Sequence, residues 1–142
     1  MPDIDYQDDE SIPDDSLLLR RILSDPNIHI VWDDNLRCWR PSSAAFDNDR
    51  NGNPMSVVLS VELIRLNRSL ASALRGHEDG FSLAAVRAGF SRNLNQVQKI
   101  VRDPTPDEPA HGLLVGKKTQ SVRRKLAKSS QWIVEPDIPE PL

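Results

Sequence analysis

The segment RCWRPSSAAF, residues 37–46, gathers side chains capable of chemistry within a short stretch. Arg37 and Arg40 flank an aromatic ring, and Ser42 and Ser43 follow directly. Guanidinium groups beside hydroxyl groups can hold a phosphate or a carboxylate, because both present hydrogen-bond donors to anionic oxygens. The segment therefore predicts a candidate anion site, with Arg37 and Arg40 as its cations.

The same segment has a structural interpretation. Trp39 can pack in a core, Pro41 can end a strand, and Ser42 or Ser43 can cap a short turn. Hydroxyl caps are common and phosphate sites are rare, so the composition favours this second interpretation. Both interpretations stay open at the level of sequence.

His111 is the second residue with catalytic potential. It follows a loop at residues 104–109 that contains three prolines, and it precedes an apolar run. A neighbouring carboxylate could orient its ring as a general base, with Ser42 or Ser43 as the nucleophile. The acidic neighbours are Asp103, Asp107 and Glu108. Neither serine stands in a G-x-S-x-G elbow, so the spacing gives a nucleophile little support.

The segment GLLVGKKT, residues 112–119, is close to a phosphate-binding loop but does not match one. Three residues separate its glycines where the loop needs four, and Lys118 stands between Lys117 and Thr119. Lys117 remains a candidate for binding an anion without nucleotide hydrolysis. The histidines and Cys38 are too scattered to predict a metal site, and no cofactor is expected.

Charge is distributed unevenly along the chain. Residues 1–15 carry seven acidic side chains and no basic one, whereas residues 112–134 carry six basic side chains and no acidic one. A basic helix can follow a nucleic-acid backbone or dock on an acidic partner protein. The side chains expected on that surface, besides Lys117, are Lys118, Arg123, Arg124, Lys125 and Lys128. The acidic segment could screen this basic surface within the same chain.

Composition predicts one small domain. The chain has 142 residues, 38% of them hydrophobic, and a formal net charge of −3. Cys38 is the only cysteine and no apolar signal segment is visible, so we expect a cytoplasmic protein without a membrane partner.

Periodicity predicts an α+β domain at residues 16–134, with short antiparallel strands and two or three helices. It follows a disordered acidic tail at residues 1–15 and precedes an extended tail at residues 135–142. Helices are expected at residues 16–26, from Ser60 to Gly76, and from Val122 to Ile133. Strands are expected at residues 28–32, 55–60 and 111–116, with a β-hairpin formed by residues 81–92 and 96–103.

The pattern R-P-S-S-x-x-F, followed by P-A-H and G-K-K, resembles a set of small uncharacterised bacterial proteins over residues 16–134. The matching positions include Arg40, Ser42, Ser43, Phe46, His111 and Lys117. The resemblance brings no activity, cofactor or catalytic residue with it.

The sequence favours a binding role over catalysis. We expect a small accessory protein of a larger bacterial system, with another protein as its partner. Two alternatives remain: a transferase or hydrolase that uses Arg40, Ser42 or Ser43 and His111, and a nucleic-acid-associated protein that uses the basic C-terminal helix. The enzyme requires His111 to converge with Arg40 in one pocket.

Overall fold

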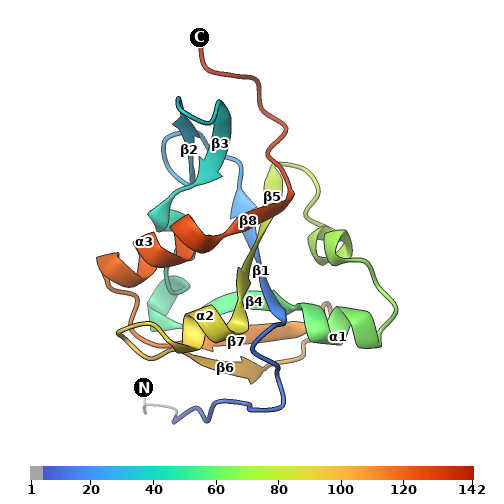
Figure 1. Cartoon of the computed structure of the whole chain (residues 1–142). Coiled ribbons are helices and arrows are strands. Elements are labelled where there is room, and N and C mark those ends of the chain that lie inside the picture. The colour runs from blue at the N-terminus through green and yellow to red at the C-terminus, as the bar shows by residue number, and fades with distance from the viewer. Residues whose placement is uncertain (1–4) are drawn as a thin grey trace.

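An antiparallel sheet forms the centre of the protein (Figure 1). The computed structural model describes residues 5–142. The strands of this part of the chain are β1 (Leu17–Leu23), β2 (Ile30–Asp33), β3 (Cys38–Pro41), β4 (Met55–Leu59), β5 (Phe81–Arg87), β6 (Lys99–Arg102), β7 (His111–Val115) and β8 (Gln131–Val134). Six of them form one sheet in the order β6-β7-β4-β1-β5-β8, and β2 and β3 form a separate hairpin. The α+β class and the antiparallel pairing are confirmed, although strands make up more of the domain than the sequence suggested.

Helices cover both faces of the sheet. The α-helices are α1 (Ser60–Arg65), α2 (Ala88–Arg92) and α3 (Gln120–Ser129), and the short 3-10 helices are η1 (Ser43–Phe46), η2 (Arg50–Gly52) and η3 (Leu70–Leu74). Figure 1 shows α3 and the β2–β3 hairpin on one side of the molecule and α1 on the other. Two apolar cores result, one containing Phe46 and Leu126 and the other containing Leu63 and Leu74.

β1 occupies the middle of the sheet, where a helix was predicted at residues 16–26. It pairs with β4 on one side and with β5 on the other. Leu18 and Ile22 enter the core below α3, while Leu19 enters the opposite core. A strand buried on both faces has an apolar run without alternation, and such a run also fits a helix. The helix prediction was wrong for this reason.

The long helix predicted from Ser60 to Gly76 is interrupted. It ends after α1, the backbone of Asn67 adopts a left-handed conformation with φ of 57°, and η3 follows. Asparagine tolerates this conformation better than most residues. Leu63 of α1 and Leu74 of η3 both pack in the core on this face of the sheet.

The hairpin predicted from residues 81–92 and 96–103 is absent from the described chain. β5 pairs with β1 and β8, whereas β6 pairs with β7, and α2 lies between β5 and β6 in sequence. Alternating residues identify a strand but not its partner.

The C-terminal helix is shorter than predicted. α3 ends at Ser129, and the next residues form β8 at one edge of the sheet. The indole Nε1 of Trp132 donates a hydrogen bond of 2.9 Å to the backbone oxygen of Trp39. This contact connects β8 to the hairpin. Beyond β8, residues 135–142 contain no helix or strand, and Ile138 packs partly against the core.

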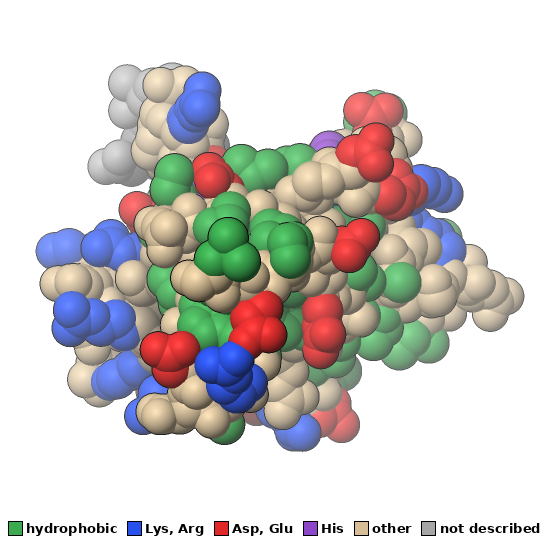
Figure 2. Space-filling view, turned by 90° about the horizontal axis from the view of Figure 1, so that it is seen from above, with side chains coloured by type: hydrophobic (Ala, Val, Ile, Leu, Met, Phe, Trp, Pro, Cys, Tyr) green, Lys and Arg blue, Asp and Glu red, His purple; other side chains and the backbone are tan. Residues whose placement is uncertain are grey.

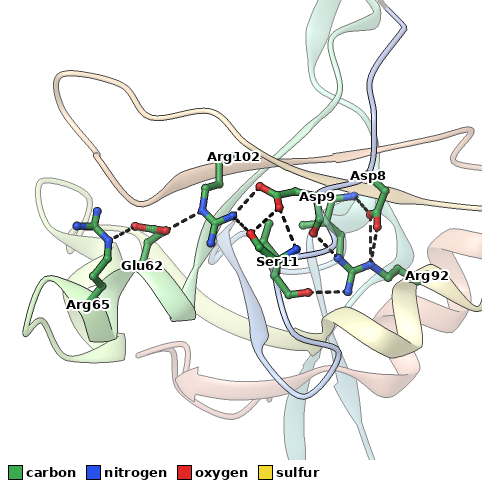
Figure 3. Close-up of polar contacts among 9 residues, drawn as sticks. Asp8, Asp9, Ser11, Glu62, Arg65, Arg92 and Arg102 are labelled. Atoms are coloured by element: carbon green, nitrogen blue, oxygen red, sulfur yellow. Dashed lines mark hydrogen bonds and ion pairs between the residues drawn. The ribbon is translucent and has the colours of Figure 1, made fainter.

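Residues 5–15, part of the segment predicted to be a disordered tail, lie against the domain. Ile12 is fully buried, and the backbone N–H of Asp9 donates to the oxygen of Ile100 in β6 at 2.8 Å. Figure 3 shows the carboxylates of Asp8 and Asp9 directed at arginines of α2 and β6. The composition indicated disorder because it could not show which cations would neutralise these acids. The prediction for residues 1–4 lies outside the described residues.

None of the helices in residues 5–142 is long and apolar enough to cross a membrane.

Candidate functional site

A cavity of about 220 Å³ opens on the face of the sheet that carries α1 and η3. We call it the histidine cavity. Its apolar lining comes from Leu19, Val57, Val58 and Phe81, and its polar lining from Arg20, Arg21, Ser56, His77 and His111. An apolar hollow with a few converging polar groups is the usual form of a small-molecule site.

Strand register brings these residues together. Leu19 of β1 pairs with Val58 of β4, which in turn pairs with His111 of β7. Side chains two residues apart on a strand share a face, so Arg21 and Ser56 lie on the same face as Leu19 and Val58. His77 also belongs to the lining, and its ring packs edge-to-face on Phe81 with 5.6 Å between ring centroids.

Arg21 brings positive charge to the cavity. Its Nε donates to the backbone oxygen of Ala73 at 2.7 Å, and its Nη2 lies 3.8 Å from Glu108 Oε1. Arg68 already holds both oxygens of that carboxylate, at 2.5 and 2.8 Å. Within residues 5–142 neither arginine pairs with another acid. Two guanidinium groups therefore share one carboxylate, which leaves an excess positive charge beside the cavity.

Burial shifts the pKa values of both Arg21 and Glu108. Burial lowers the pKa of Arg21, and Glu108 only partly offsets that effect. Burial also raises the pKa of Glu108, but the hydrogen bonds from Arg68 and from the Ala110 N–H outweigh it, so the pKa of the carboxyl is lowered overall. Glu108 is therefore ionised at neutral pH, and its charge is already shared by two cations.

His111 is oriented by the loop that precedes it. Its Nδ1 lies 2.9 Å from the backbone oxygen of Asp103 and 3.1 Å from Asp103 Oδ2. Both neighbours are acceptors, so the neutral ring carries its proton on Nδ1 and keeps Nε2 free to accept a hydrogen bond. The sequence prediction that an acidic neighbour orients His111 thus has a geometric counterpart in Asp103.

Ser56 is held from both sides. Its hydroxyl donates to Asp49 Oδ2 at 2.6 Å, and its backbone oxygen accepts a hydrogen bond from Arg20 Nη1 at 2.7 Å. The proton of the hydroxyl is directed at Asp49. Ser56 is therefore a fixed polar group of the lining.

A second hollow, shallower and about 590 Å³ in volume, lies between the β2–β3 hairpin and α3. We call it the basic groove. Its lining residues are Val31, Asp33, Arg40, Pro41, Ser42, Ser43, Arg124, Ala127 and Lys128. Figure 2 shows Lys and Arg side chains gathered on the left of the molecule, the side where Figure 1 places α3. The groove thus unites the predicted anion segment with part of the predicted basic helix.

The predicted catalytic residues do not form one site. His111 lines the histidine cavity, whereas Arg40, Ser42 and Ser43 line the basic groove. The hydroxyl of Ser42 donates to the backbone oxygen of Ile28 at 2.5 Å. Ser42 precedes η1, but its side chain makes no capping hydrogen bond to that helix, so the predicted side-chain cap is not formed by Ser42.

The remaining predicted cations occupy different environments. Lys118 is buried, and its Nζ donates to the oxygens of Leu114 and Gly116, so it is not part of a surface. Burial lowers its pKa to about 8. Lys117 and Lys125 are exposed.

Two arginines predicted to bind anions or partners contact acids of this chain. Arg123 Nη1 lies 3.6 Å from Asp47 Oδ2. Arg37 pairs with Glu140 and lies over the ring of Trp32. Both are therefore occupied within the domain and do not line the basic groove.

Sequence reasoning missed Arg21, Ser56, His77 and Phe81. The only available signal was a charged pair inside a leucine-rich run, LLLRRIL, since an arginine in a central strand needs a buried partner. The other three lie in segments whose partners the sequence did not indicate.

Among residues 5–142, no group of three His, Cys, Asp or Glu side chains is placed to hold a metal ion. Comparison of the chain with protein-family models, with curated proteins and with solved structures found no match.

Proposed function

We propose that this protein acts by binding, and that its ligand is a small organic anion with one flat apolar part, held in the histidine cavity. The observation that supports the proposal is the excess positive charge of Arg21 and Arg68 around the single carboxylate of Glu108. A partly buried cation that shares its counterion gains more from a second anion than a fully solvated one does, because the effective dielectric constant around it is lower.

The size and lining of the cavity limit the ligand. Its volume of about 220 Å³ is below the roughly 300–1,000 Å³ typical of sites for drug-sized ligands. Leu19, Val58 and Phe81 offer an apolar surface for a ring, and Arg21 and His111 offer donors or acceptors for its polar substituents. An aromatic ring with one phosphate or carboxylate group meets both requirements.

The binding role agrees with the leading expectation from the sequence. The larger bacterial system and the partner protein stay predictions. The enzyme alternative gains no support from this cavity, because the one serine in its lining directs its hydroxyl proton at Asp49 rather than at His111.

Titration calorimetry with phenyl phosphate, benzoate and the neutral benzamide tests the proposal. We expect both anions to bind and benzamide to bind at least tenfold more weakly. Arg21→Gln should weaken phenyl phosphate binding by about ten- to hundredfold, the range for a lost charge-assisted hydrogen bond. Arg75→Gln, at an exposed arginine near η3, removes the same charge outside the cavity and should change binding by less than twofold.

Arg21→Lys and His77→Ala are two milder variants that keep the test informative if Arg21→Gln does not fold. Arg21→Lys keeps the charge and should retain part of the affinity, while His77→Ala removes an exposed side chain at the lip of the cavity. Circular dichroism confirms that each variant is folded. Equal binding of benzamide and phenyl phosphate, or undiminished binding by a folded Arg21→Gln variant, would overturn the proposal.

A further inference from the structure

The basic groove has cations on two facing walls. Arg40 extends from β3, and Arg124 and Lys128 lie four residues apart on α3, so both face the same side of the helix. Within residues 5–142, none of the three forms an ion pair. Cations that face one another across a hollow repel, and an anion between them relieves that repulsion.

The one acid in the described lining of the groove does not balance its three cations. Asp33 is the only acid in the described lining, and its Oδ1 accepts hydrogen bonds from the backbone N–H groups of Asn35 and Leu36 at 2.9 and 3.0 Å. Asp33 therefore holds the hairpin turn, and its single carboxylate leaves the three cations of the lining in excess.

The acidic N-terminal segment is also engaged elsewhere. Asp8 and Asp14 pair with Arg92 of α2, and Asp9 pairs with Arg102 of β6. Figure 3 shows the contacts of Asp8 and Asp9. Over residues 5–15, the expected screening of the C-terminal helix does not occur. As far as residues 5–142 are concerned, the cations of the groove stay available to an external anion.

From this arrangement we infer that the basic groove binds the sugar-phosphate backbone of a single-stranded nucleic acid. Arginine, lysine and serine are the side chains that contact phosphate oxygens most often, and all three types line the groove. The hollow is shallow and open, which suits a continuous chain rather than an enclosed small molecule. A flexible strand adapts its phosphates to such a hollow more readily than a rigid duplex does, and this favours a single strand over a duplex.

The lining also determines what the groove does not recognise. No aromatic side chain belongs to the described lining, so no platform is present on which bases stack. Binding is therefore expected to depend on charge and to show little preference for sequence. This function is separate from that of the histidine cavity, which shares no lining residue with the groove.

Fluorescence anisotropy of a labelled oligothymidylate of about 20 nucleotides tests the inference, since that length exceeds the usual site of a single-strand-binding domain. With three phosphate contacts, the logarithm of the affinity should fall with the logarithm of the salt concentration with a slope of about −2. This corresponds to a loss of roughly 20-fold between 50 and 200 mM salt. A duplex of the same length should bind at least fivefold more weakly.

A matched pair of double variants separates the groove from general charge. Arg40→Gln with Arg124→Gln removes two cations from the groove, and Lys117→Gln with Lys125→Gln removes two exposed cations outside it. The first variant should bind at least tenfold more weakly and show a shallower salt slope. The second should stay within threefold of the wild type.

Three results would overturn the inference: no binding at the lower salt concentration, equal losses in the two double variants, or competition by polyglutamate as effective as competition by unlabelled oligothymidylate. The last result would instead identify a surface for acidic peptides. Phenyl phosphate binding by the groove variant should be unchanged, so the groove and the histidine cavity can fail independently.

Discussion

Arg68 and Glu108, forty residues apart, form a two-pronged ion pair across the face of the sheet that carries the histidine cavity. The Nη1 and Nη2 atoms of Arg68 lie 2.5 and 2.8 Å from the two carboxylate oxygens of Glu108. Arg68 follows the break after α1, and Glu108 lies in the loop before β7, so the pair connects the cover of the sheet to the strand that carries His111. Because Arg68 binds both carboxylate oxygens of Glu108, Arg21 has no acid of its own within residues 5–142.

Glu108→Gln should lower the free energy of unfolding by about 3 kcal/mol, because it leaves Arg68 and Arg21 largely buried without a counterion. Urea denaturation at neutral pH measures the effect. Glu78→Gln removes an exposed acid and should change stability by less than about 0.5 kcal/mol. Equal effects of the two substitutions would show that the pair does not stabilise the fold.

Acid should weaken the contacts between the N-terminal segment and the sheet. Hydrogen bonds from Ser11 and Arg102 lower the pKa of Asp9 below its ordinary value of 3.8, and Arg102 and Arg65 lower the pKa of Glu62 below 4.5. Each carboxylate therefore stabilises the folded state above its ordinary pKa, and this contribution is lost as the pH falls through the lowered value.

The double variant Asp9→Asn with Glu62→Gln checks this pH dependence. Unfolding free energies at pH 6 and pH 3 should differ more in the wild type than in the variant. A variant with the same acid sensitivity as the wild type would locate the sensitive carboxylates elsewhere.

Alkaline pH should stabilise the protein through Lys118. Its pKa is about 8 in the folded state and 10.5 ordinarily, so between these values the unfolded chain holds a proton that the folded protein has released. Stability therefore rises with pH in this window, by about 1 kcal/mol per pH unit. Lys118→Met removes the titrating group, and the difference in unfolding free energy between the two proteins should shift in favour of the wild type from pH 8 to pH 10. A constant difference would contradict the buried position of the ammonium group.

Ile12→Ala should cost about 2–4 kcal/mol, the range for truncating a fully buried aliphatic side chain. Ile64→Ala is the matched control, because 68% of Ile64 is exposed and its truncation should cost less than about 1 kcal/mol. Thermal unfolding compares the two. Hydrogen exchange at the amide of Asp9, which bonds to Ile100, should increase in the first variant only. Similar stabilities would mean that residues 5–15 contribute nothing to the core.

The sequence predicted the elements whose signals are local. The turn-rich segment before β4 and the apolar runs of β4 and β7 were found where the structure has them, because turn residues bound them closely. The helix expected at residues 16–26 shows the opposite case. LLLRRIL contains no information on whether both faces will be covered, and only the neighbours β4 and β5 determine that it is a strand.

The sequence likewise predicted only part of the candidate site. His111 stood out because a rigid loop precedes it, and Arg40 stood out because it lies close to serines. The pairing of β1 with β4 and of β4 with β7, which brings Arg21 beside Ser56 and His111, joins segments more than thirty residues apart. Lys118 was wrongly predicted to lie on the basic surface. The number of basic residues in a segment does not show which ammonium group points inward and donates to backbone oxygens.

The contact between Asp9 and Ile100 has a consequence for how copies of this protein behave at high concentration. β6 is an edge strand of the sheet, and its Ile100 N–H and oxygen are both engaged by the N-terminal segment, through Asp8 and Asp9. An uncovered edge offers unpaired backbone groups to a second chain and promotes strand addition and aggregation. Removing residues 1–12 therefore exposes the backbone groups of Ile100 and the apolar surface that Ile12 covers. The truncated protein should self-associate at concentrations at which the full chain stays monodisperse.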